Sequence, residues 1–207
     1  MKQIKYNRTV RSEKPKYIVI HTTGNPNSGA DAEAHYKYWN SGNVGQSADF
    51  VVDDTQALQI NDYTKYYTWH CGDGKGKYGI TNSNSIGIEI CVNADGNFYK
   101  AVENAVALVK KLRTETGITN IVRHYDASRK NCPAEFAPND WAKWKEFLNA
   151  VNEACVKELE SVNDIVWELN ERGIISDKAL WLKKLETDKN SYWLARKCAN
   201  FIRGNCK

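Results

Sequence analysis

Hydrophobic and polar positions along residues 1–150 follow two different periods, and each period predicts one type of element. Short β-branched or alternating apolar runs predict strands, which we expect at residues 17–21, 48–52, 57–60, 85–91 and 121–122. Apolar residues at helical spacing predict a helix at 31–39, a second from Val102 to Leu112 that stops at Gly117, and a third capped by Asn139. Strands that alternate with helices indicate an α/β domain.

The strand expected at 85–91 has the clearest two-residue period. Three isoleucines, beginning with Ile86, share one face, whereas Glu89 and Cys91 share the other. Glu89 is therefore expected to project away from the apolar face. The preceding segment, 72–84, is rich in glycine, asparagine and serine and predicts a long loop. Long loops beside a cleft often carry function.

After about residue 153 the strand period disappears and only helical stripes remain. One stripe covers 162–169 and ends at Gly173, and a second, with Ser176 as its expected cap, carries Leu182 and Leu185. The third stripe consists of Leu194, Cys198, Phe201 and Ile202. We therefore divide the chain into a domain at 1–153 and a small three-helix module at 158–207, near the lower size limit for independent stability. The aromatic residues expected on the module's surface are Trp167, Trp181, Tyr192 and Trp193.

Composition and charge limit the classes of partner that we expect. The 207 residues are 42% hydrophobic and 26% charged, and the net charge of +4 is not clustered, so we expect no nucleic-acid partner. We also expect no membrane partner, because no run of 18 apolar residues occurs. Residues 1–6 lack the apolar core of a signal peptide, which predicts synthesis in the cytoplasm. The six cysteines include no CxxC pair and are expected to be reduced thiols.

Two histidines and one cysteine form the most informative set of polar residues. His21 ends an apolar run, and His124 lies eight residues before Cys132. Three such ligands leave a fourth tetrahedral position of zinc open, as hydrolytic zinc sites require. The other interpretation is two unrelated polar histidines and a buried thiol. Spacing alone leaves both open.

Five short motifs in order carry a resemblance to a known family. They are Tyr17-Ile18-Val19-Ile20-His21-Thr22-Thr23, Trp69-His70-Cys71-Gly72, Ser85-Ile86-Gly87-Ile88-Glu89-Ile90, His124-Tyr125-Asp126 and Lys130-Asn131-Cys132-Pro133. Together they resemble the type 2 N-acetylmuramoyl-L-alanine amidases, which include phage endolysins, autolysins and peptidoglycan recognition proteins. The resemblance covers about residues 15–150 and implies a mixed central sheet flanked by helices.

The resemblance also implies a site and a reaction. It implies a zinc ion (Zn²⁺) on His21, His124 and Cys132, with Glu89 as catalytic carboxylate and Lys130 as charge stabiliser. The implied reaction is hydrolysis of the amide between N-acetylmuramic acid and L-alanine in bacterial peptidoglycan, leading to wall lysis. An enzyme of the endolysin type without a signal peptide would reach the wall through a membrane pore or after lysis.

Both catalytic roles agree with the chemistry of the side chains. Glu89 can take a proton from water and pass it to the leaving amine, and Lys130 can stabilise an oxyanion. The competing interpretations are a surface carboxylate and a solvated loop lysine. Trp69 and His70 are expected to line the substrate cleft, where packing in the core is the alternative for the tryptophan. Thr22 is expected to contact substrate or to support a ligand.

One segment departs from the family pattern. Where the family often has histidine or a tyrosine–histidine pair, this chain has Ser47-Ala48-Asp49-Phe50. Ala48 and Asp49 remove tyrosine as a catalytic group, so the expected chemistry depends more on Glu89. The sequence does not predict which stem peptide is preferred.

Other functions compete with the enzyme. The first is a non-catalytic module that binds peptidoglycan, although such a relative is expected to lose the thiol, and Cys132 is present. A purely structural zinc would need a fourth protein ligand, for which Cys71, Cys91 and Asp126 are available. For the C-terminal module, cell-wall binding is an analogy from the domain order of lysins, and a structural or dimerisation bundle is its alternative.

Overall fold

A computed structural model describes residues 2–152, 162–188, 191, 192, 195, 198 and 199. The chain forms two compact units, Met1–Val151 and Asn152–Lys207, which are described separately. Within the described residues, no helix is both long enough and apolar enough to span a bilayer.

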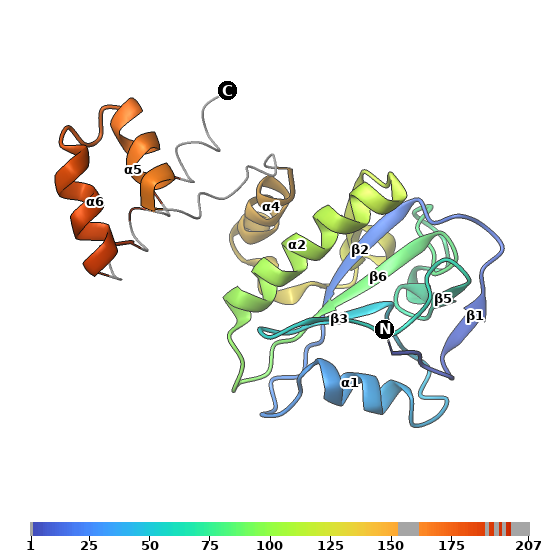
Figure 1. Ribbon diagram of the computed structural model, residues 1–207. Helices are drawn as coiled ribbons and strands as arrows, with labels where there is room; N and C mark the ends of the chain where they lie inside the picture. The colour runs from blue at the N-terminus through green and yellow to red at the C-terminus, as the bar shows by residue number, and fades with distance from the viewer. Residues whose placement is uncertain (1, 153–161, 189–190, 193–194, 196–197, 200–207) are drawn as a thin grey trace. The chain divides into compact units, whose positions relative to one another are not determined.

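A five-stranded mixed sheet forms the centre of the first unit (Figure 1). Its order is β4 (Ala57–Gln59), β3 (Phe50–Val52), β6 (Ser85–Ile90), β2 (Tyr17–Thr22) and β7 (Asn120–Arg123). The pairs β3–β6, β6–β2 and β2–β7 are parallel, and β4 runs antiparallel to β3. This mixed sheet confirms the predicted fold class.

The register of the central strands places chemistry at one edge of the sheet. His21 of β2 lies opposite Glu89 of β6. Arg123, the last residue of β7, pairs with Ile20 of β2, so His124 follows at the same edge. Because the carboxyl ends of parallel strands meet at one edge, three segments distant in sequence deliver their polar residues there.

The two faces of the sheet are covered by different helices (Figure 1). On one face, the isoleucines of β2 and β6 pack against α2 (Phe98–Thr116) and α4 (Pro138–Asn152). On the other, Val51 packs with Ala32 and Trp39 of α1 (Ala32–Trp39). Each fully buried aliphatic side chain contributes about 1.5–3 kcal/mol. The isoleucine face therefore stabilises the fold, whereas Glu89 lies on the opposite face, at the carboxyl end of β6.

Helix ends agree with the predictions in some places and not in others. Gly117 ends α2 with a φ of 73°, as predicted. Asp31 caps α1 and Asn97 caps α2, two caps that were not predicted. The prediction that Asn139 caps a helix is wrong. Pro138 begins α4, and Asn139 has a left-handed φ of 55°, whereas an N-cap needs extended backbone.

Short elements complete the first unit, and several were not predicted. A two-stranded antiparallel sheet joins β1 (Arg8–Val10) to β5 (Tyr66–Thr68). His124 begins α3 (His124–Ser128), and η1 (Gly72–Gly74) lies at the start of the predicted long loop. A further 3₁₀ turn, η2 (Ala134–Phe136), follows Cys132. These elements contain three to five residues each, too few for a periodic pattern.

The second unit contains α5 (Val162–Glu171) and α6 (Lys178–Thr187). Its apolar cluster consists of Ile165, Val166, Leu169, Ile175, Leu185, Ala195 and Ala199. Asp177 caps α6 by accepting a hydrogen bond from the Leu180 amide, so the expectation of Ser176 was wrong by one residue.

The predicted surface of this module is confirmed only in part. Trp167 is 56% exposed, whereas Trp181 and Tyr192 pack against the apolar cluster. Cys198 is exposed and does not belong to a buried stripe. Trp193, Leu194, Phe201 and Ile202 lie outside the described residues.

Candidate active site

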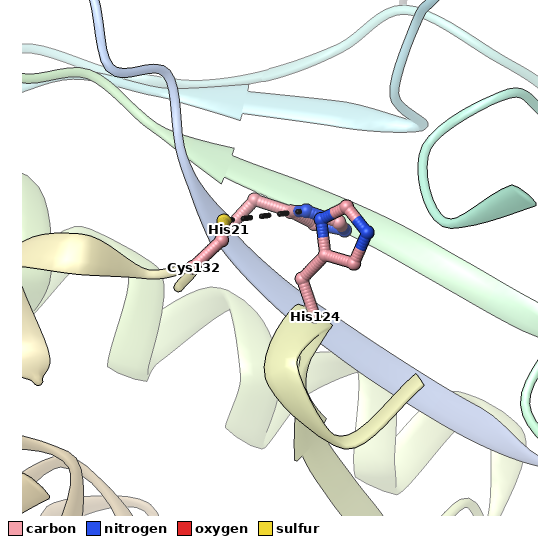
Figure 2. Close-up of side chains that lie close together, drawn as sticks. All are labelled: His21, His124 and Cys132. Atoms are coloured by element: carbon pink, nitrogen blue, oxygen red, sulfur yellow. Dashed lines mark hydrogen bonds between the residues drawn. The ribbon is translucent and has the colours of Figure 1, made fainter. Parts of the chain in front are cut away.

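The structure brings His21, His124 and Cys132 together (Figure 2). One ligand atom from each lies within 4.8 Å of the others, and all three residues are buried. His21 comes from the end of β2, His124 from the start of α3, and Cys132 from the loop that follows α3. His21 Nδ1 lies 3.8 Å from the Cys132 sulfur. Two imidazoles and a thiolate are a donor set that suits zinc.

Unpaired buried atoms support the fit to a cation. His124 Nδ1 and Glu89 Oε2 are both buried, and within the described part of the chain neither has a hydrogen-bond partner. An unpaired buried polar atom costs free energy. A metal ion beside His124 Nδ1 would offset that cost. The residues present therefore fit zinc.

Burial favours the protonation state that a metal requires of histidine. It lowers the pKa of His21 well below its ordinary value and lowers the pKa of His124, where Asp73 acts in the opposite direction. Both rings are thus neutral at pH 7, as metal ligands must be. Burial also raises the pKa of the Cys132 thiol to about 12. A coordinated divalent cation reverses that preference and binds the thiolate.

Glu89 lies beside this cluster. Its Oε1 is 3.9 Å from His21 Nδ1, and its side chain is 16% exposed. Burial raises the pKa of Glu89 to about 8, against the opposing charge of Lys130. A carboxylate with a pKa near the working pH suits proton transfer. Lys130 lines the same cleft and is exposed.

The cluster lies in an open cleft of about 560 Å³, within the size range of ligand sites. Trp69, half-buried, lines it and donates from Nε1 to the Thr9 hydroxyl at 3.1 Å. Thr22 also lines it, and its hydroxyl accepts from the Ala134 amide at 3.3 Å, beside Cys132. Thr22 thus anchors the loop that carries the thiol.

His70, predicted to contact substrate, lies against the ring of His21. It lines the cleft but is only 9% exposed. Its Nδ1 is 3.0 Å from His21 Nε2, and its Nε2 is 3.1 Å from the Ser85 hydroxyl. Both ring nitrogens therefore have partners inside the protein.

Sequence reasoning missed Asp73. Its Oδ1 lies 2.7 Å from His124 Nε2. The only signal in the sequence is its place just after the Trp69–Gly72 motif. A carboxylate in a predicted loop does not reveal a histidine partner 51 residues away.

The segment that departs from the family pattern does not reach the cleft through Asp49. The Asp49 carboxylate is fully buried and accepts hydrogen bonds from Asn61 at 2.7 Å, Thr68 at 3.0 Å and the Gly87 amide at 2.8 Å. Ala48 belongs to the apolar cluster beside α1. Asp49 therefore joins β3, β5 and β6 inside the first unit.

The three residues considered as a fourth zinc ligand have other partners. The Cys71 sulfur is 3.7 Å from the Ser85 hydroxyl, and the Cys91 sulfur is 4.0 Å from His35 Nδ1. Asp126 pairs with Arg123 at 2.6 Å. The cluster as described consists of His21, His124 and Cys132 without them. This geometry favours an open zinc site over a closed structural one.

Comparison with known proteins identifies the family. The family model described as N-acetylmuramoyl-L-alanine amidase matches residues 11–135, a range that contains every residue of the cluster. The chain belongs to the N-acetylmuramoyl-L-alanine amidase family. This confirms the resemblance carried by the five motifs.

Two relatives from this amidase family come from Bacillus subtilis (strain 168). The N-acetylmuramoyl-L-alanine amidase CwlH is 40% identical over 70% of this chain and 56% of its own length. The amidase XlyA is 42% identical over 67% of this chain and 46% of its own length. The chain thus spans about half the length of these relatives.

Solved structures share the fold of a large part of this chain. The catalytic domain of XlyA superposes with a TM-score of 0.63 at 40% identity, covering 70% of this chain and 92% of that domain. The structure of PlyL gives the same TM-score at 32% identity, and the match covers 75% of this chain and 99% of the PlyL chain.

Proposed function

We propose that this protein is a zinc-dependent N-acetylmuramoyl-L-alanine amidase. It would hydrolyse the amide between the lactyl group of N-acetylmuramic acid and L-alanine in bacterial peptidoglycan. One observation carries the proposal: a buried cluster of His21, His124 and Cys132 lies in an open cleft beside Glu89, whose buried Oε2 has no hydrogen-bond partner among the described residues. Family membership and the names of CwlH and XlyA support the substrate class.

The chemistry divides between the metal and the chain. Zinc held by His21, His124 and Cys132 would polarise the scissile carbonyl and lower the pKa of water. Glu89 accepts the proton of the attacking water and returns it to the leaving L-alanine nitrogen. Lys130 brings a positive charge to the oxygen that becomes negative during attack. No tyrosine is required in this scheme.

We also propose a role for each of the two parts of the chain. The domain at 1–153 would carry the catalysis, and the module at 158–207 would bind the cell wall, with the exposed Trp167 as one contact. An aromatic ring at the surface can stack on sugar or peptide. The alternative for the whole protein, a recognition module without catalysis, is less favoured because Cys132 and Glu89 are both in place.

Product analysis tests this function. Zinc-loaded protein is incubated with purified Gram-positive peptidoglycan, and the new chain ends are identified by mass spectrometry. New L-alanine amino termini on intact glycan strands are expected, and Cys132→Ser is expected to produce none. New reducing ends, or cleavage within the stem peptide, would contradict the proposed bond. Binding of zinc and wall without new ends would favour the recognition module.

A further inference from the structure

One short segment, His70–Asp73, contacts both proposed histidine ligands, in each case at Nε2 of the ring. His70 Nδ1 lies 3.0 Å from His21 Nε2, and Asp73 Oδ1 lies 2.7 Å from His124 Nε2. In both ligands Nε2 is occupied, which leaves Nδ1 of each ring for the metal. His124 Nδ1 is buried and without a partner in the described chain.

We propose that Asp73 and His70 are positioning residues, which hold the two imidazoles with Nδ1 directed at the zinc. The inference rests on the zinc site of the proposed function and extends it to residues outside the ligand set. Histidine ligands usually donate their second ring N–H to a carboxylate or another acceptor, which fixes ring orientation and tautomer.

Hydrogen-bond directions behind His21 follow from one fixed acceptor. The Thr81 carbonyl can only accept, so the Ser85 hydroxyl donates to it. Ser85 then accepts from His70 Nε2–H, at 3.1 Å. His70 Nδ1 therefore has no proton and accepts from His21 Nε2–H. The chain of bonds leaves the lone pair of His21 on Nδ1, the nitrogen beside Cys132.

Asp73 has the same effect on the tautomer of His124. Its carboxylate can only accept, so His124 donates from Nε2 and keeps the lone pair on Nδ1. A negative charge on the far side of the ring also makes the imidazole a stronger ligand. The two positioning residues differ: Asp73 supplies charge, whereas His70 is neutral and relays to Ser85.

Close backbone approaches hold the segment in place. A Cβ at Gly74 would lie 2.1 Å from the Ala127 carbonyl oxygen, so η1 packs directly on α3, which carries His124. A Cβ at Gly87 would lie 2.6 Å from the His70 ring. The amides of His70 and Cys71 both donate to the Asn82 side chain, at 3.0 and 2.7 Å. Glycine at 74 and 87 therefore lets the segment reach both ligands.

The test is a measurement of zinc affinity. Competition with a chromophoric chelator gives the zinc Kd of wild type, Asp73→Ala and Asp73→Asn. Loss of an outer partner of a ligand typically weakens metal binding about 10–100-fold. We expect that loss for Asp73→Ala and a smaller one for Asp73→Asn, which keeps an acceptor without the charge. Asp95→Ala is the matched control, because its carboxylate binds the Gly29 amide.

A second readout separates positioning from a general loss of structure. In the Co²⁺-substituted protein, Asp73→Ala is expected to change the visible d–d absorption, whereas Asp95→Ala leaves it unchanged. Thermal unfolding of the metal-free variants should show similar Tm values. For His70, replacement by Ala should weaken zinc binding, and replacement by Asn, whose amide oxygen can accept from His21, should restore part of it.

The outcomes separate the two proposals. If wild type binds zinc tightly and Asp73→Ala and His70→Ala leave the Kd and the Co²⁺ spectrum unchanged, the positioning role is overturned and the amidase proposal stands. If wild type binds no zinc, while Cys132→Ser behaves identically, the zinc site itself is wrong and the positioning role falls with it.

Discussion

At the residue scale, Glu89 depends on where its strand places it. The isoleucines on either side fill the core, and the two-residue period directs the carboxylate to the opposite face. There its Oε1 lies 3.9 Å from His21 Nδ1, and its buried Oε2 has no hydrogen-bond partner within the described chain. A buried carboxylate oxygen without a hydrogen bond costs stability. An ionisable group in such an unfavourable environment is typical of a functional site.

Glu89→Gln should separate catalysis from metal binding. The amide cannot accept a proton from water, so we expect kcat to fall by about 10²–10⁴-fold. Zinc content should stay at the wild-type level, because the three ligands are unchanged. Release of L-alanine amino termini and metal analysis measure the two effects. The exposed Glu103→Gln on α2 is the control. Full activity in Glu89→Gln would remove the carboxylate from the mechanism.

Lys130→Met tests the charge in the cleft. Methionine has similar length and no charge, so stabilisation of the oxyanion is lost. Loss of one such group typically costs about 10²–10³ in kcat, and we expect zinc binding to remain. Lys100→Met, on the exposed start of α2, is the matched control. Equal kcat values for Lys130→Met and wild type would show that zinc stabilises the oxyanion without Lys130.

At the element scale, the turn after β3 supports the first turn of α1. The buried Asp53 accepts hydrogen bonds from the Ala32 amide at 3.1 Å, the Thr55 amide at 2.8 Å and the Gln56 amide at 2.9 Å. Burial alone would raise the pKa of Asp53, but these hydrogen bonds outweigh it and lower the pKa. The ionised carboxylate therefore stabilises the junction of β3 and α1.

Asp53→Ala should lower stability in a pH-dependent way. Removing the acceptor of several amides should cost about 1–3 kcal/mol at pH 7. The folded pKa lies below the unfolded value of about 3.9, so the stabilisation is full above that value and disappears as pH falls through the folded pKa. The free energy of unfolding, measured with urea, should thus differ more between wild type and Asp53→Ala at pH 7 than at pH 3.

The control for Asp53 is its neighbour. Among the described residues, Asp54 accepts one hydrogen bond, from the Asn97 amide at 3.0 Å. Asp54→Ala should therefore lose less stability than Asp53→Ala. An equal difference between wild type and Asp53→Ala at both pH values would contradict the role of the ionised carboxylate.

Prediction from sequence succeeded where a pattern is long enough to repeat. The strand with Glu89 and the helix that ends at Gly117 were both predicted, because apolar periodicity and a glycine stop mark them. The cap predicted at Ser176 was wrong because its neighbour Asp177 takes that position, and the cap predicted at Asn139 was wrong because its backbone is left-handed. Asp73 was missed because its partner belongs to another element, and only the folded chain shows that contact.

At the scale of the whole molecule, the two compact units divide the proposed roles. The first contains the cleft and matches the family model, whereas the second contains α5 and α6. In the described part of the second unit, Trp167 and Leu180 are 56% and 61% exposed.

Trp167→Ala should weaken attachment to the wall without changing the chemistry. We expect a smaller fraction of protein to pellet with purified cell walls, because a ring that stacks on sugar or peptide is lost. Hydrolysis of a soluble muramyl peptide should stay at the wild-type rate. Tyr99→Ala, which removes an exposed aromatic ring from the first unit, is the control. Unchanged pelleting, or a change from dimer to monomer, would favour the dimerisation bundle.

We propose that His21, His124 and Cys132 hold one zinc ion whose fourth position is open to solvent. X-ray absorption at the zinc edge, together with metal analysis, measures this coordination. We expect one zinc per chain, with two nitrogen neighbours at about 2.0–2.1 Å and one sulfur at about 2.3 Å. A fourth, light-atom neighbour from solvent should complete the site. A second sulfur neighbour, or unchanged zinc content in Cys132→Ser, would show that this zinc site is wrong.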